Sequence, residues 1–456
     1  MYDIVVIGAG ICGSSIAAEL SKYDLKTIII EKSYDVSNGT TKANSAIVHA
    51  GYDPTPNTLM AKFNIIGNSM FPKLCKDLSV PFKQIGSLVL AFSNEDLCTV
   101  NELYKRGKVN GVPDMRILGK SQILEMEPNI NSEVKKALCC GTAGIVSPYE
   151  LAIALCENAH SNGVEIKLNS EVLNITKRAD CFELKTSDKT IKSKLVINAA
   201  GIFADKINNM VSANNFKIKP IKGQYLLLNK TTGNLAMHVI FQCPSSLGKG
   251  VLVTPTVYGN TLIGPDAQET NSKNDTSICE DNLEYIKTAA LKSYPEIPFN
   301  KSIKTFAGLR AEANAKDFVI GEAKDVPNFI NVAGIKSPGL SSSPAIAKYI
   351  STIVLSKFKQ IDKNKSFTPY RKSPMLKYMS NSCRDNFIKN DPNYSNITCK
   401  CEQISEGEII NAISRFPYAT TRDGVKRRVR AGMGPCQGSR CGPLVDNLLS
   451  NLDNSK

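Results

Sequence analysis

Four cysteines near the C-terminal end of the chain have a spacing that suits a metal centre. One residue separates Cys399 from Cys401, and four residues separate Cys436 from Cys441. Four thiolates can ligate the two irons of an iron–sulfur cluster, and they can also satisfy one zinc ion. Because the spacing differs from the paired C-x2-C knuckles that are usual for zinc, we expect an iron–sulfur cluster, with zinc as the alternative occupant.

A glycine-rich motif at the other end of the chain suits the binding of a dinucleotide. Its glycines are Gly8, Gly10 and Gly13, and they lie between an apolar run at residues 3–7 and a helical stretch that ends near Leu20. Glu31 follows a second apolar run, residues 27–30, roughly 20 residues after the motif. Glycines let the backbone approach a pyrophosphate, the helix N-terminus supplies N–H donors, and the carboxylate can accept from a ribose hydroxyl. This order of elements predicts a dinucleotide site.

Three further segments favour FAD over NAD, through their resemblance to segments of flavoproteins. Residues 195–201 read as a strand that runs into small residues, where the chain can pass close to a bound cofactor. Residues 334–344 form a Gly/Ser-rich turn ahead of a helix expected to begin near Ala345, and a helix N-terminus stabilises negative charge on a bound group. The hydroxyls and amides of residues 37–42 can extend contacts to phosphate and ribitol.

The same residues, in the same order, resemble the D-amino-acid-oxidase-like FAD oxidoreductases. Within them the chain resembles the branch that holds FAD-dependent glycerol-3-phosphate dehydrogenases and L-2-hydroxyglutarate oxidases. The resemblance spans residues 1–350 and rests on Glu31 and the segments 8–13, 43–52, 199–201, 253–256, 306–310 and 334–344. It implies an α/β fold in which a Rossmann-like FAD domain is interleaved with a substrate domain built on a mixed or antiparallel sheet.

The resemblance also predicts how the chain is divided. Within one unit, residues 1–355, the FAD part would comprise residues 1–85, 145–205 and 305–355, and the substrate part residues 86–144 and 206–304. Residues 356–396 are rich in Lys, Asn, Ser and Pro and read as a linker.

Residues 397–456 resemble a small helical [2Fe–2S]-binding domain related to bacterioferritin-associated ferredoxin. The match covers residues 399–402 and 430–441, so it makes Cys399, Cys401, Cys436 and Cys441 the predicted ligands. Between the cysteine pairs, residues 405–421 read as a helix with a capping box formed by Ser405 and Glu408.

The resemblance implies that several separate segments hold FAD. The residues expected to contact it are Gly8, Gly10, Gly13, Glu31, Thr40, Thr41, Asn44, Ser45, Val172, Ala200, Gly201, Gly334, Pro338, Gly339, Leu340 and Ser341.

Three side chains are candidates for catalysis and substrate binding. By resemblance His49 lies near the flavin, where its imidazole, with an ordinary pKa of about 6.5, can accept the hydroxyl proton of a substrate or simply position the flavin ring. The planar guanidinium of Arg310 can hold a carboxylate or a phosphate, or it can form an ordinary surface salt bridge. Lys336 can add charge for a phosphate or point to solvent.

These expectations favour a dehydrogenase that contains FAD and a [2Fe–2S] cluster and oxidises sn-glycerol 3-phosphate to dihydroxyacetone phosphate. A hydride would pass to the flavin, and electrons would leave through the cluster to a partner, either a second flavoprotein subunit or a membrane-associated, quinone-linked subunit. L-2-hydroxyglutarate oxidation is the alternative, because the segment around His49 serves both groups. An amino- or imino-acid oxidoreductase and a non-catalytic electron-transfer subunit are further alternatives.

The charge of the chain is strongly positive. Its 456 residues have a formal net charge of +14, which suits an anionic substrate. We find no RNA-binding module and no basic stretch interleaved with aromatic residues, so we expect no nucleic-acid partner. The tightest basic cluster, residues 422–430, suits either solvation or the docking of an acidic partner protein.

Features of the whole sequence also predict a location. No apolar stretch reaches the ~18 residues that a membrane span needs, and no secretory signal precedes the first strand. Fourteen cysteines without such a signal indicate free thiols in a reducing compartment. We therefore expect a cytoplasmic protein without a transmembrane segment, held at the inner face of the membrane only through a partner.

Overall fold

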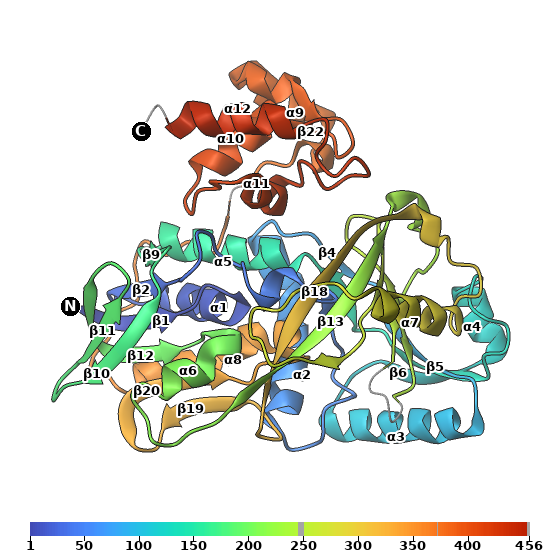
Figure 1. The fold of residues 1–456 in the computed structure, drawn as a ribbon, viewed down its shortest axis with the longest axis horizontal. Coiled ribbons are helices and arrows are strands. Elements are labelled where there is room, and N and C mark those ends of the chain that lie inside the picture. Colours follow the sequence, from blue (N-terminus) through green and yellow to red (C-terminus); the bar gives the residue numbers. More distant parts are fainter. Residues whose placement is uncertain (245–249, 372, 454–456) are drawn as a thin grey trace.

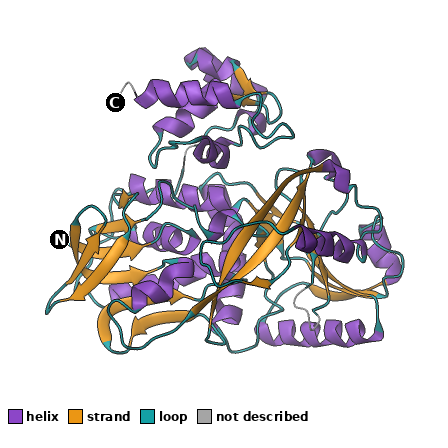
Figure 2. Cartoon of the chain, in the orientation of Figure 1, coloured by secondary structure: helices purple, strands orange, loops and turns teal. Residues whose placement is uncertain are grey.

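The computed structural model describes residues 1–244, 250–371 and 373–453. Two large sheets lie side by side, and a small unit formed by the C-terminal part of the chain lies over helix α5 (Figure 1). The small unit is mainly helical, whereas strands dominate much of the part below it (Figure 2). The architecture confirms the expected α/β fold with a separate helical C-terminal unit.

The first large sheet has eight strands and contains the N-terminal strand. Its path runs β10-β11-β12-β1-β2-β9, with β20 beside β12 and β19 beside β20. The strands are β1 (Tyr2–Ile7), β2 (Thr27–Ile30), β9 (Glu165–Lys167), β10 (Val172–Lys177), β11 (Phe182–Thr186), β12 (Thr190–Asn198), β19 (Val319–Ala323) and β20 (Val326–Ala333). The central strands β20, β12, β1, β2 and β9 pair in parallel. Strands that are buried on both faces read as continuous apolar runs, which is why β1 and β2 could be predicted.

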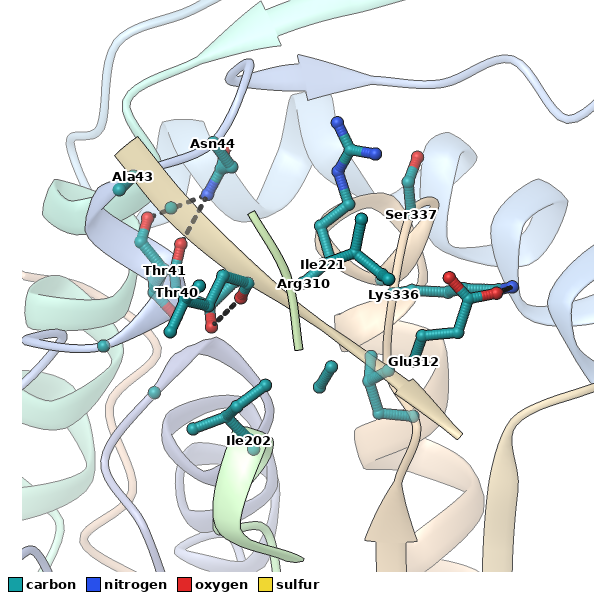
Figure 3. A pocket seen from close by; sticks show the side chains of 18 of the residues that line it. Thr40, Thr41, Ala43, Asn44, Ile202, Ile221, Arg310, Glu312, Lys336 and Ser337 are labelled. Atoms are coloured by element: carbon teal, nitrogen blue, oxygen red, sulfur yellow. Dashed lines mark hydrogen bonds and ion pairs between the residues drawn. The ribbon is translucent and has the colours of Figure 1, made fainter. Parts of the chain in front are cut away.

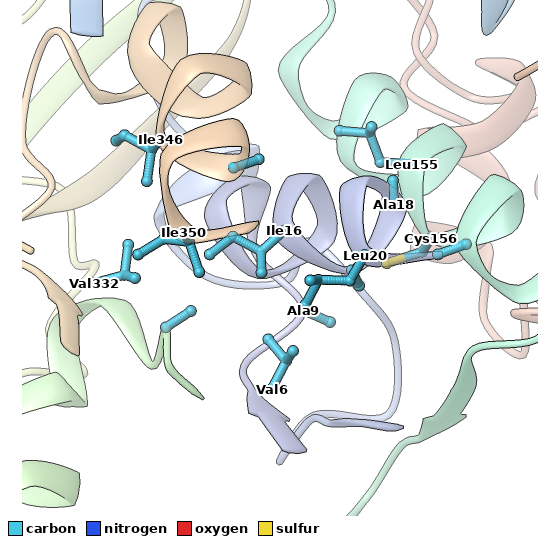
Figure 4. Packing of buried hydrophobic residues seen from close by; sticks show 14 of the residues in the cluster. Val6, Ala9, Ile16, Ala18, Leu20, Leu155, Cys156, Val332, Ile346 and Ile350 are labelled. Carbon is cyan, nitrogen blue, oxygen red and sulfur yellow. The ribbon is translucent and has the colours of Figure 1, made fainter. Parts of the chain in front are cut away.

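Helices cover this sheet and position the glycine motif. They include α1 (Ile11–Leu20), α2 (Leu59–Asp77), α5 (Pro148–Ser161), α6 (Ala204–Asn208) and α8 (Gly339–Leu355). Helix α1 lies between α5 and α8 (Figure 4). Ile16 and Leu20 of α1 are fully buried in one cluster with Val6 and Ile350. Full burial of such a side chain contributes about 1.5–3 kcal/mol, so the start of α1 is fixed against the end of β1.

Helix α8 begins earlier than expected. It starts at Gly339 rather than near Ala345, and it contains Pro344. A proline inside a helix leaves the carbonyl four residues earlier without its usual N–H donor. Here the hydroxyl of Ser343 donates to the Leu340 carbonyl at 2.9 Å, which satisfies that group and lets the helix continue through the proline.

The second large sheet has nine strands. Its path runs β17-β13-β16-β15-β14-β5-β7-β6, and β18 pairs with β13. The strands are β5 (Ser87–Ala91), β6 (Met115–Gly119), β7 (Lys136–Cys140), β13 (Ile218–Leu228), β14 (Val239–Gln242), β15 (Leu252–Pro255), β16 (Thr261–Gly264), β17 (Gln268–Glu269) and β18 (Ser302–Ala313). Only β5 and β14 pair in parallel among these pairings, so the sheet is mixed, as expected. The residues near 305, expected in the FAD part, belong to this sheet because β18 pairs along β13.

Smaller elements complete the main part of the chain. A three-stranded sheet has the order β3-β8-β4. Its strands are β3 (Ile47–Val48), β4 (Phe82–Gln84) and β8 (Gly144–Val146), and the remaining helices are α3 (Asn94–Asn110), α4 (Lys120–Met126) and α7 (Glu280–Leu291). None of the helices formed by the described residues has both the length and the apolar character needed to cross a bilayer.

The C-terminal unit is built around its own apolar core. Its elements are α9 (Asn381–Asn390), β21 (Ile397–Cys399), β22 (Ile404–Ser405), α10 (Glu406–Ser414), α11 (Arg422–Val429) and α12 (Gly442–Asp453). Ile404, Ile409 and Val425 are fully buried in this core. The predicted capping box of Ser405 and Glu408 begins α10, although the helix ends at Ser414, before the expected residue 421. Helix α9 lies within residues 356–396, the segment expected to be a linker or a partly ordered connection.

The expectation for the basic cluster at residues 422–430 is wrong for three of its arginines, although Arg422 lies at the surface. Arg427, Arg428 and Arg430 are 2%, 1% and 4% exposed, so they face neither solvent nor a partner protein. Arg427 and Arg428 bind the carboxylate of Asp35, which follows β2, and Arg430 binds Glu402. Arg427 and Arg428 hold the C-terminal unit against the rest of the same chain through Asp35, whereas the pair of Arg430 with Glu402 lies within this unit.

Candidate functional site

A cavity of about 1340 Å³ lies between the two large sheets. The residues at the carboxyl ends of three parallel strands line it: Ile7 and Gly8 at the end of β1, Ile30 and Glu31 at the end of β2, and Ala199 to Gly201 after β12. Strands β13 and β18 of the nine-stranded sheet form the opposite wall. The carboxyl edge of an open parallel sheet is where such folds bind ligands. The cavity exceeds the ~300–1,000 Å³ typical of a drug-sized ligand, so it has room for a dinucleotide and a small substrate.

The glycine motif fits tightly between β12 and α1. Gly8 has a φ of +102°, and a Cβ atom there would lie 2.6 Å from the Ala199 carbonyl oxygen. A Cβ atom on Gly13 would lie 1.9 Å from the Gly8 carbonyl oxygen. Gly8 and Gly10 line the cavity, whereas Gly13 lies outside its lining and supports the turn through this packing. The turn therefore presents bare backbone to the cavity, which is what a pyrophosphate requires.

Polar side chains around the turn shape the cavity wall. Glu31 lines the cavity and accepts the backbone N–H groups of Ala9 at 2.8 Å and Ser33 at 2.9 Å. Thr41 accepts the N–H of Ile11 at 3.0 Å. The Thr40 hydroxyl donates to the Leu309 carbonyl oxygen of β18 at 2.6 Å, which joins the two walls. These groups organise the loop, and their contacts to FAD stay predictions.

Most of the predicted cofactor residues line this one cavity. Those in its wall are Gly8, Gly10, Glu31, Thr40, Thr41, Asn44, Ser45, Val172, Ala200, Gly201, Pro338, Gly339 and Leu340. Gly13, Gly334 and Ser341 are not among the lining residues. Ser341 acts from behind the wall, since its hydroxyl oxygen accepts the backbone N–H of His49 at 2.7 Å.

His49 lies in the cavity wall directly after β3. Its carbonyl oxygen accepts the side-chain amides of Asn64 at 3.0 Å and Asn68 at 3.1 Å, so the backbone is fixed from α2. The ring stacks near Phe241 at 5.8 Å between centroids, and Nε2 lies 3.2 Å from the Ser337 hydroxyl. The imidazole is therefore held beside the start of α8.

Arg310 enters the cavity from β18. One Nη atom donates to the Asp266 carbonyl oxygen at 3.0 Å. Among the described residues no carboxylate lies within ion-pair distance of this guanidinium, so the surface salt bridge considered as its alternative role does not form. In Figure 3 the guanidinium of Arg310 and the hydroxyl of Ser337 extend on the same side of β18.

The four C-terminal cysteines come together as two pairs. The sulfur atoms of Cys401 and Cys436 lie 3.7 Å apart, and the thiols of Cys399 and Cys441 are hydrogen-bonded to each other. Within the described part of the chain, no three or more His, Cys, Asp or Glu side chains gather around one point as a single metal ion would require. Each iron of a four-cysteine [2Fe–2S] cluster takes two thiolates, so separate pairs fit this cluster better than one zinc ion.

The surroundings of the Cys436 sulfur also fit an iron–sulfur site. The backbone N–H groups of Gly438 and Arg440 donate to the sulfur and lower the pKa of the thiol to about 7. Backbone N–H groups that point at cysteine sulfurs stabilise the anionic ligands of a cluster. The assignment of all four cysteines as ligands stays a prediction.

Comparison with known protein families assigns both parts of the chain. Residues 3–353 match the family described as FAD dependent oxidoreductase. The chain belongs to the FAD dependent oxidoreductase family. Residues 397–451 match the BFD-like [2Fe-2S] binding domain, so this oxidoreductase ends in a domain of the [2Fe–2S] type, as expected.

Two relatives of this oxidoreductase are named as glycerol 3-phosphate enzymes. It is 52% identical over 451 residues to a glycerol 3-phosphate dehydrogenase of Caloramator mitchellensis, and the alignment covers 99% of this chain and 94% of that protein. It is 40% identical over 356 residues to a glycerol 3-phosphate oxidase of Mycoplasma genitalium, and this alignment covers 76% of this chain and 92% of that protein. Proteins named L-2-hydroxyglutarate dehydrogenase are more distant, at 26% to 29% identity.

A solved structure supports the same fold. The dithionite-reduced L-alpha-glycerophosphate oxidase from Mycoplasma pneumoniae, with FAD bound, superposes with a TM-score of 0.78 and 31% sequence identity. The match covers 82% of this chain and 99% of that chain. The FAD-binding fold of this oxidoreductase is therefore shown by sequence and by structure.

The cations in the cavity wall of this oxidoreductase differ in their partners. Lys336 forms an ion pair with Glu312, and Figure 3 shows the two side chains extending together away from Arg310. Lys273 pairs with Asp205, and Lys206 pairs with Glu171 at 3.4 Å. These carboxylates compensate the charges of the three lysines, whereas no carboxylate in the described part of the chain lies within ion-pair distance of Arg310. Lys336 is therefore a weaker candidate for phosphate binding than the sequence indicated.

Tyr225 is a candidate site residue that the sequence did not reveal. It lies on β13, lines the cavity and hydrogen-bonds with Arg310 and Ser45. Burial raises the pKa of this phenol, and the neighbouring Arg310 opposes the rise without cancelling it. Tyr225 is thus a protonated donor at neutral pH beside the predicted anion site. In the sequence it was one residue of an apolar strand, and only the pairing of β13 with β18 brings it to Arg310.

Proposed function

We propose that this protein oxidises sn-glycerol 3-phosphate to dihydroxyacetone phosphate and sends the electrons out through its [2Fe–2S]-type domain. The observation that carries the proposal is Arg310, a partly buried cation in the cavity of an FAD-dependent oxidoreductase, for which the described residues offer no carboxylate partner. The 52% identity to a glycerol 3-phosphate dehydrogenase over 99% of the chain supports the choice of substrate.

Different residues of the cavity bind the substrate and accept its proton. Arg310 binds the phosphate with its planar guanidinium, and Tyr225 donates a further hydrogen bond beside it. His49 accepts the proton of the carbinol hydroxyl at Nε2, where the substrate hydroxyl replaces the Ser337 hydroxyl that lies 3.2 Å from this atom. FAD, when bound, accepts the hydride from the carbinol carbon. Holding the phosphate fixes the distance between this carbon and the imidazole.

L-2-hydroxyglutarate is the second candidate substrate. Its carboxylates could also bind Arg310, because a guanidinium pairs with carboxylate and phosphate in the same geometry. The relatives with this name are only 26% to 29% identical, so they support it less than the glycerol 3-phosphate enzymes support the first candidate.

The C-terminal domain indicates a protein or quinone-linked electron acceptor rather than oxygen. The relative named dehydrogenase aligns over 99% of this chain, whereas the relative named oxidase aligns over 76%. A one-electron centre at the end of the chain suits transfer to another redox protein. We therefore propose a separate acceptor subunit, either a second flavoprotein or a quinone-linked protein at the membrane.

Steady-state turnover with an artificial acceptor tests the proposed substrate. The holoenzyme is assayed without oxygen, with ferricyanide as acceptor and with glycerol 3-phosphate, L-2-hydroxyglutarate, glycerol or amino acids as donors. We expect kcat/KM for glycerol 3-phosphate to exceed that for glycerol by about 100-fold or more, because one charged contact contributes roughly 3 kcal/mol. A higher kcat/KM for L-2-hydroxyglutarate would move the assignment to the second candidate.

A further inference from the structure

Arg430 lies in the C-terminal unit, at its contact with the rest of the chain. It follows α11 with a left-handed φ of 67°, and it precedes the loop that leads to Cys436. Only 4% of the residue is exposed. A non-glycine residue in this conformation, with a charged side chain that is almost fully buried, is held by its surroundings.

One contact of Arg430 joins the two cysteine loops. Its Nε donates to Glu402 at 2.9 Å, and Glu402 directly follows Cys401. The Cys401 and Cys436 sulfurs lie 3.7 Å apart. The contact between Arg430 and Glu402 therefore connects the two loops that carry these cysteines. Glu402 also accepts Lys230 of the main part of the chain at 2.8 Å.

Other contacts of Arg430 reach both halves of the main part of the chain. The guanidinium carbon lies 3.7 Å from the ring centre of Tyr258, which follows β15, and Nη1 lies 3.4 Å from the Tyr149 hydroxyl on α5. The Tyr149 hydroxyl also contacts the Met433 sulfur in the cysteine loop at 3.6 Å. A stacked guanidinium with two directed hydrogen bonds defines one orientation, which a lysine cannot reproduce.

The same contacts lead by a short path to the cofactor cavity. Tyr149 stands at the start of α5, directly after β8. The N–H of Val146 in β8 donates to the Ala46 carbonyl at 3.0 Å, and Ala46 lies between Ser45 and Ile47, which both line the cavity. A shift of the cysteine loops relative to Tyr149 would therefore change their distance to the cavity.

We propose that Arg430 is a positioning residue that holds the Cys401 and Cys436 loops at a fixed distance from the cofactor cavity, and that electron transfer between the two centres depends on it. The inference rests on the proposed electron route. In this step the reduced flavin is oxidised and the cluster is reduced by one electron, with one Fe³⁺ becoming Fe²⁺. The second electron follows after an external one-electron acceptor, ferricyanide in the assay, has reoxidised the cluster.

The test compares Arg430→Gln with a matched variant, Arg422→Gln, in the holoenzyme. Arg422 begins the same helix and pairs with Asp446 at the surface, with 50% and 47% side-chain exposure. Stopped-flow spectra separate flavin reduction by substrate from the later reduction of the cluster. We expect Arg430→Gln to slow cluster reduction roughly tenfold or more with unchanged flavin reduction, and Arg422→Gln to leave both rates unchanged.

Hydrogen exchange supplies a readout that does not depend on turnover. In Arg430→Gln the backbone amides of residues 400–402 and 431–436 should exchange faster than in the native protein. They should keep their native rates in Arg422→Gln. Arg430→Lys keeps the charge for Glu402 but loses the stacking and one donor, so we expect it to restore only part of the cluster-reduction rate.

Two further measurements distinguish a role of Arg430 in electron transfer from a loss of folding and from a wrong substrate. Tyr149→Phe removes one hydroxyl and leaves the buried Arg430 pair intact, and it should slow cluster reduction in the same direction by a smaller factor. Flash photoreduction of the flavin measures transfer to the cluster even if glycerol 3-phosphate fails as a substrate. Native cluster-reduction rates in Arg430→Gln, or equal slowing of flavin and cluster reduction, would overturn the role proposed for Arg430.

Discussion

Arg428 and Asp35 form a two-pronged ion pair with both side chains at 0% exposure. The Arg428 Nη1 and Nη2 atoms each lie 2.8 Å from a different carboxylate oxygen of Asp35. Arg427 binds the same carboxylate at 2.7 Å. Asp35 lies in the segment between β2 and the cavity-lining residues 38–45, so helix α11 of the C-terminal domain directly holds the loop that shapes the cofactor cavity.

Removal of the Asp35 carboxylate should destabilise the protein strongly. Asp35→Ala leaves two buried arginines without their carboxylate, and breaking a buried pair in this way costs about 3–5 kcal/mol. Asp446→Ala breaks the exposed pair with Arg422, where the expected cost is about 0–1 kcal/mol. Urea unfolding of the holo-protein measures both changes. Equal losses of unfolding free energy would show that burial of the Asp35 pair does not matter.

Tight packing at Gly13 should make FAD retention sensitive to one added methyl group. A Cβ atom there would lie 1.9 Å from the Gly8 carbonyl oxygen, so Gly13→Ala must move the turn. We expect purified Gly13→Ala protein to contain little FAD. Gly119→Ala is the matched control, because the nearest atom to a Cβ atom there is 3.9 Å away. Acid release of the flavin and its absorbance give the content, and full FAD in Gly13→Ala would refute the close-packing argument.

Arg310 and Lys336 should differ in their effect on substrate binding. Arg310→Gln removes a cation that has no carboxylate partner among the residues the structure describes, so we expect KM for glycerol 3-phosphate to rise by about 100-fold, which corresponds to roughly 3 kcal/mol. Lys336→Gln removes a cation that Glu312 already compensates, and KM should rise less than about tenfold. FAD content serves as the control for folding. A larger KM increase in Lys336→Gln than in Arg310→Gln would reverse the two assignments.

Glu157 should make the docking of the C-terminal unit sensitive to acid. Burial alone would raise the pKa of this α5 carboxyl, but Arg371 and Arg415 outweigh burial and lower the pKa below its ordinary value. A lowered pKa in the folded state stabilises the protein above the unfolded-state pKa of about 4.3, and this stabilisation disappears as pH falls through the folded-state pKa.

The measurement for Glu157 is unfolding free energy against pH. Between about pH 5 and pH 3 the native protein should lose stability faster than Glu157→Gln, because the variant has no proton to bind at this position. Above pH 6 the variant should be the less stable of the two, since it lacks the charge that binds Arg371 and Arg415. Parallel curves for the two proteins over the acid range would show that the pKa of Glu157 is not lowered in the folded protein.

The parts of the fold that depend on local spacing were predictable from the sequence. Gly8, Gly10 and Glu31 line one cavity because a strand, a turn and a helix of fixed dimensions leave few ways to place them. His49 and Arg310 were found through a resemblance to a family, and the structure brings both to the cavity from different sheets. Spacing alone could not have joined residues that are so far apart in the chain.

Features that depend on distant partners were not predictable. The arginines at 427, 428 and 430 read as a surface cluster because nothing nearby in the sequence indicates that Asp35 and Glu402 lie opposite them. Tyr225 gains its candidate role from the register between β13 and β18, and Glu312 on β18 compensates the charge of Lys336. Helix α8 begins before Pro344 because a serine hydroxyl replaces the missing donor, which composition does not reveal.

Anaerobic titration of the oxidised holoenzyme with sn-glycerol 3-phosphate tests the proposed function most directly. The flavin absorbance should bleach with this substrate, the cluster absorbance should fall after it, and the same concentration of L-2-hydroxyglutarate should have little effect. Bleaching by L-2-hydroxyglutarate with no response to glycerol 3-phosphate would show that glycerol 3-phosphate is not the substrate.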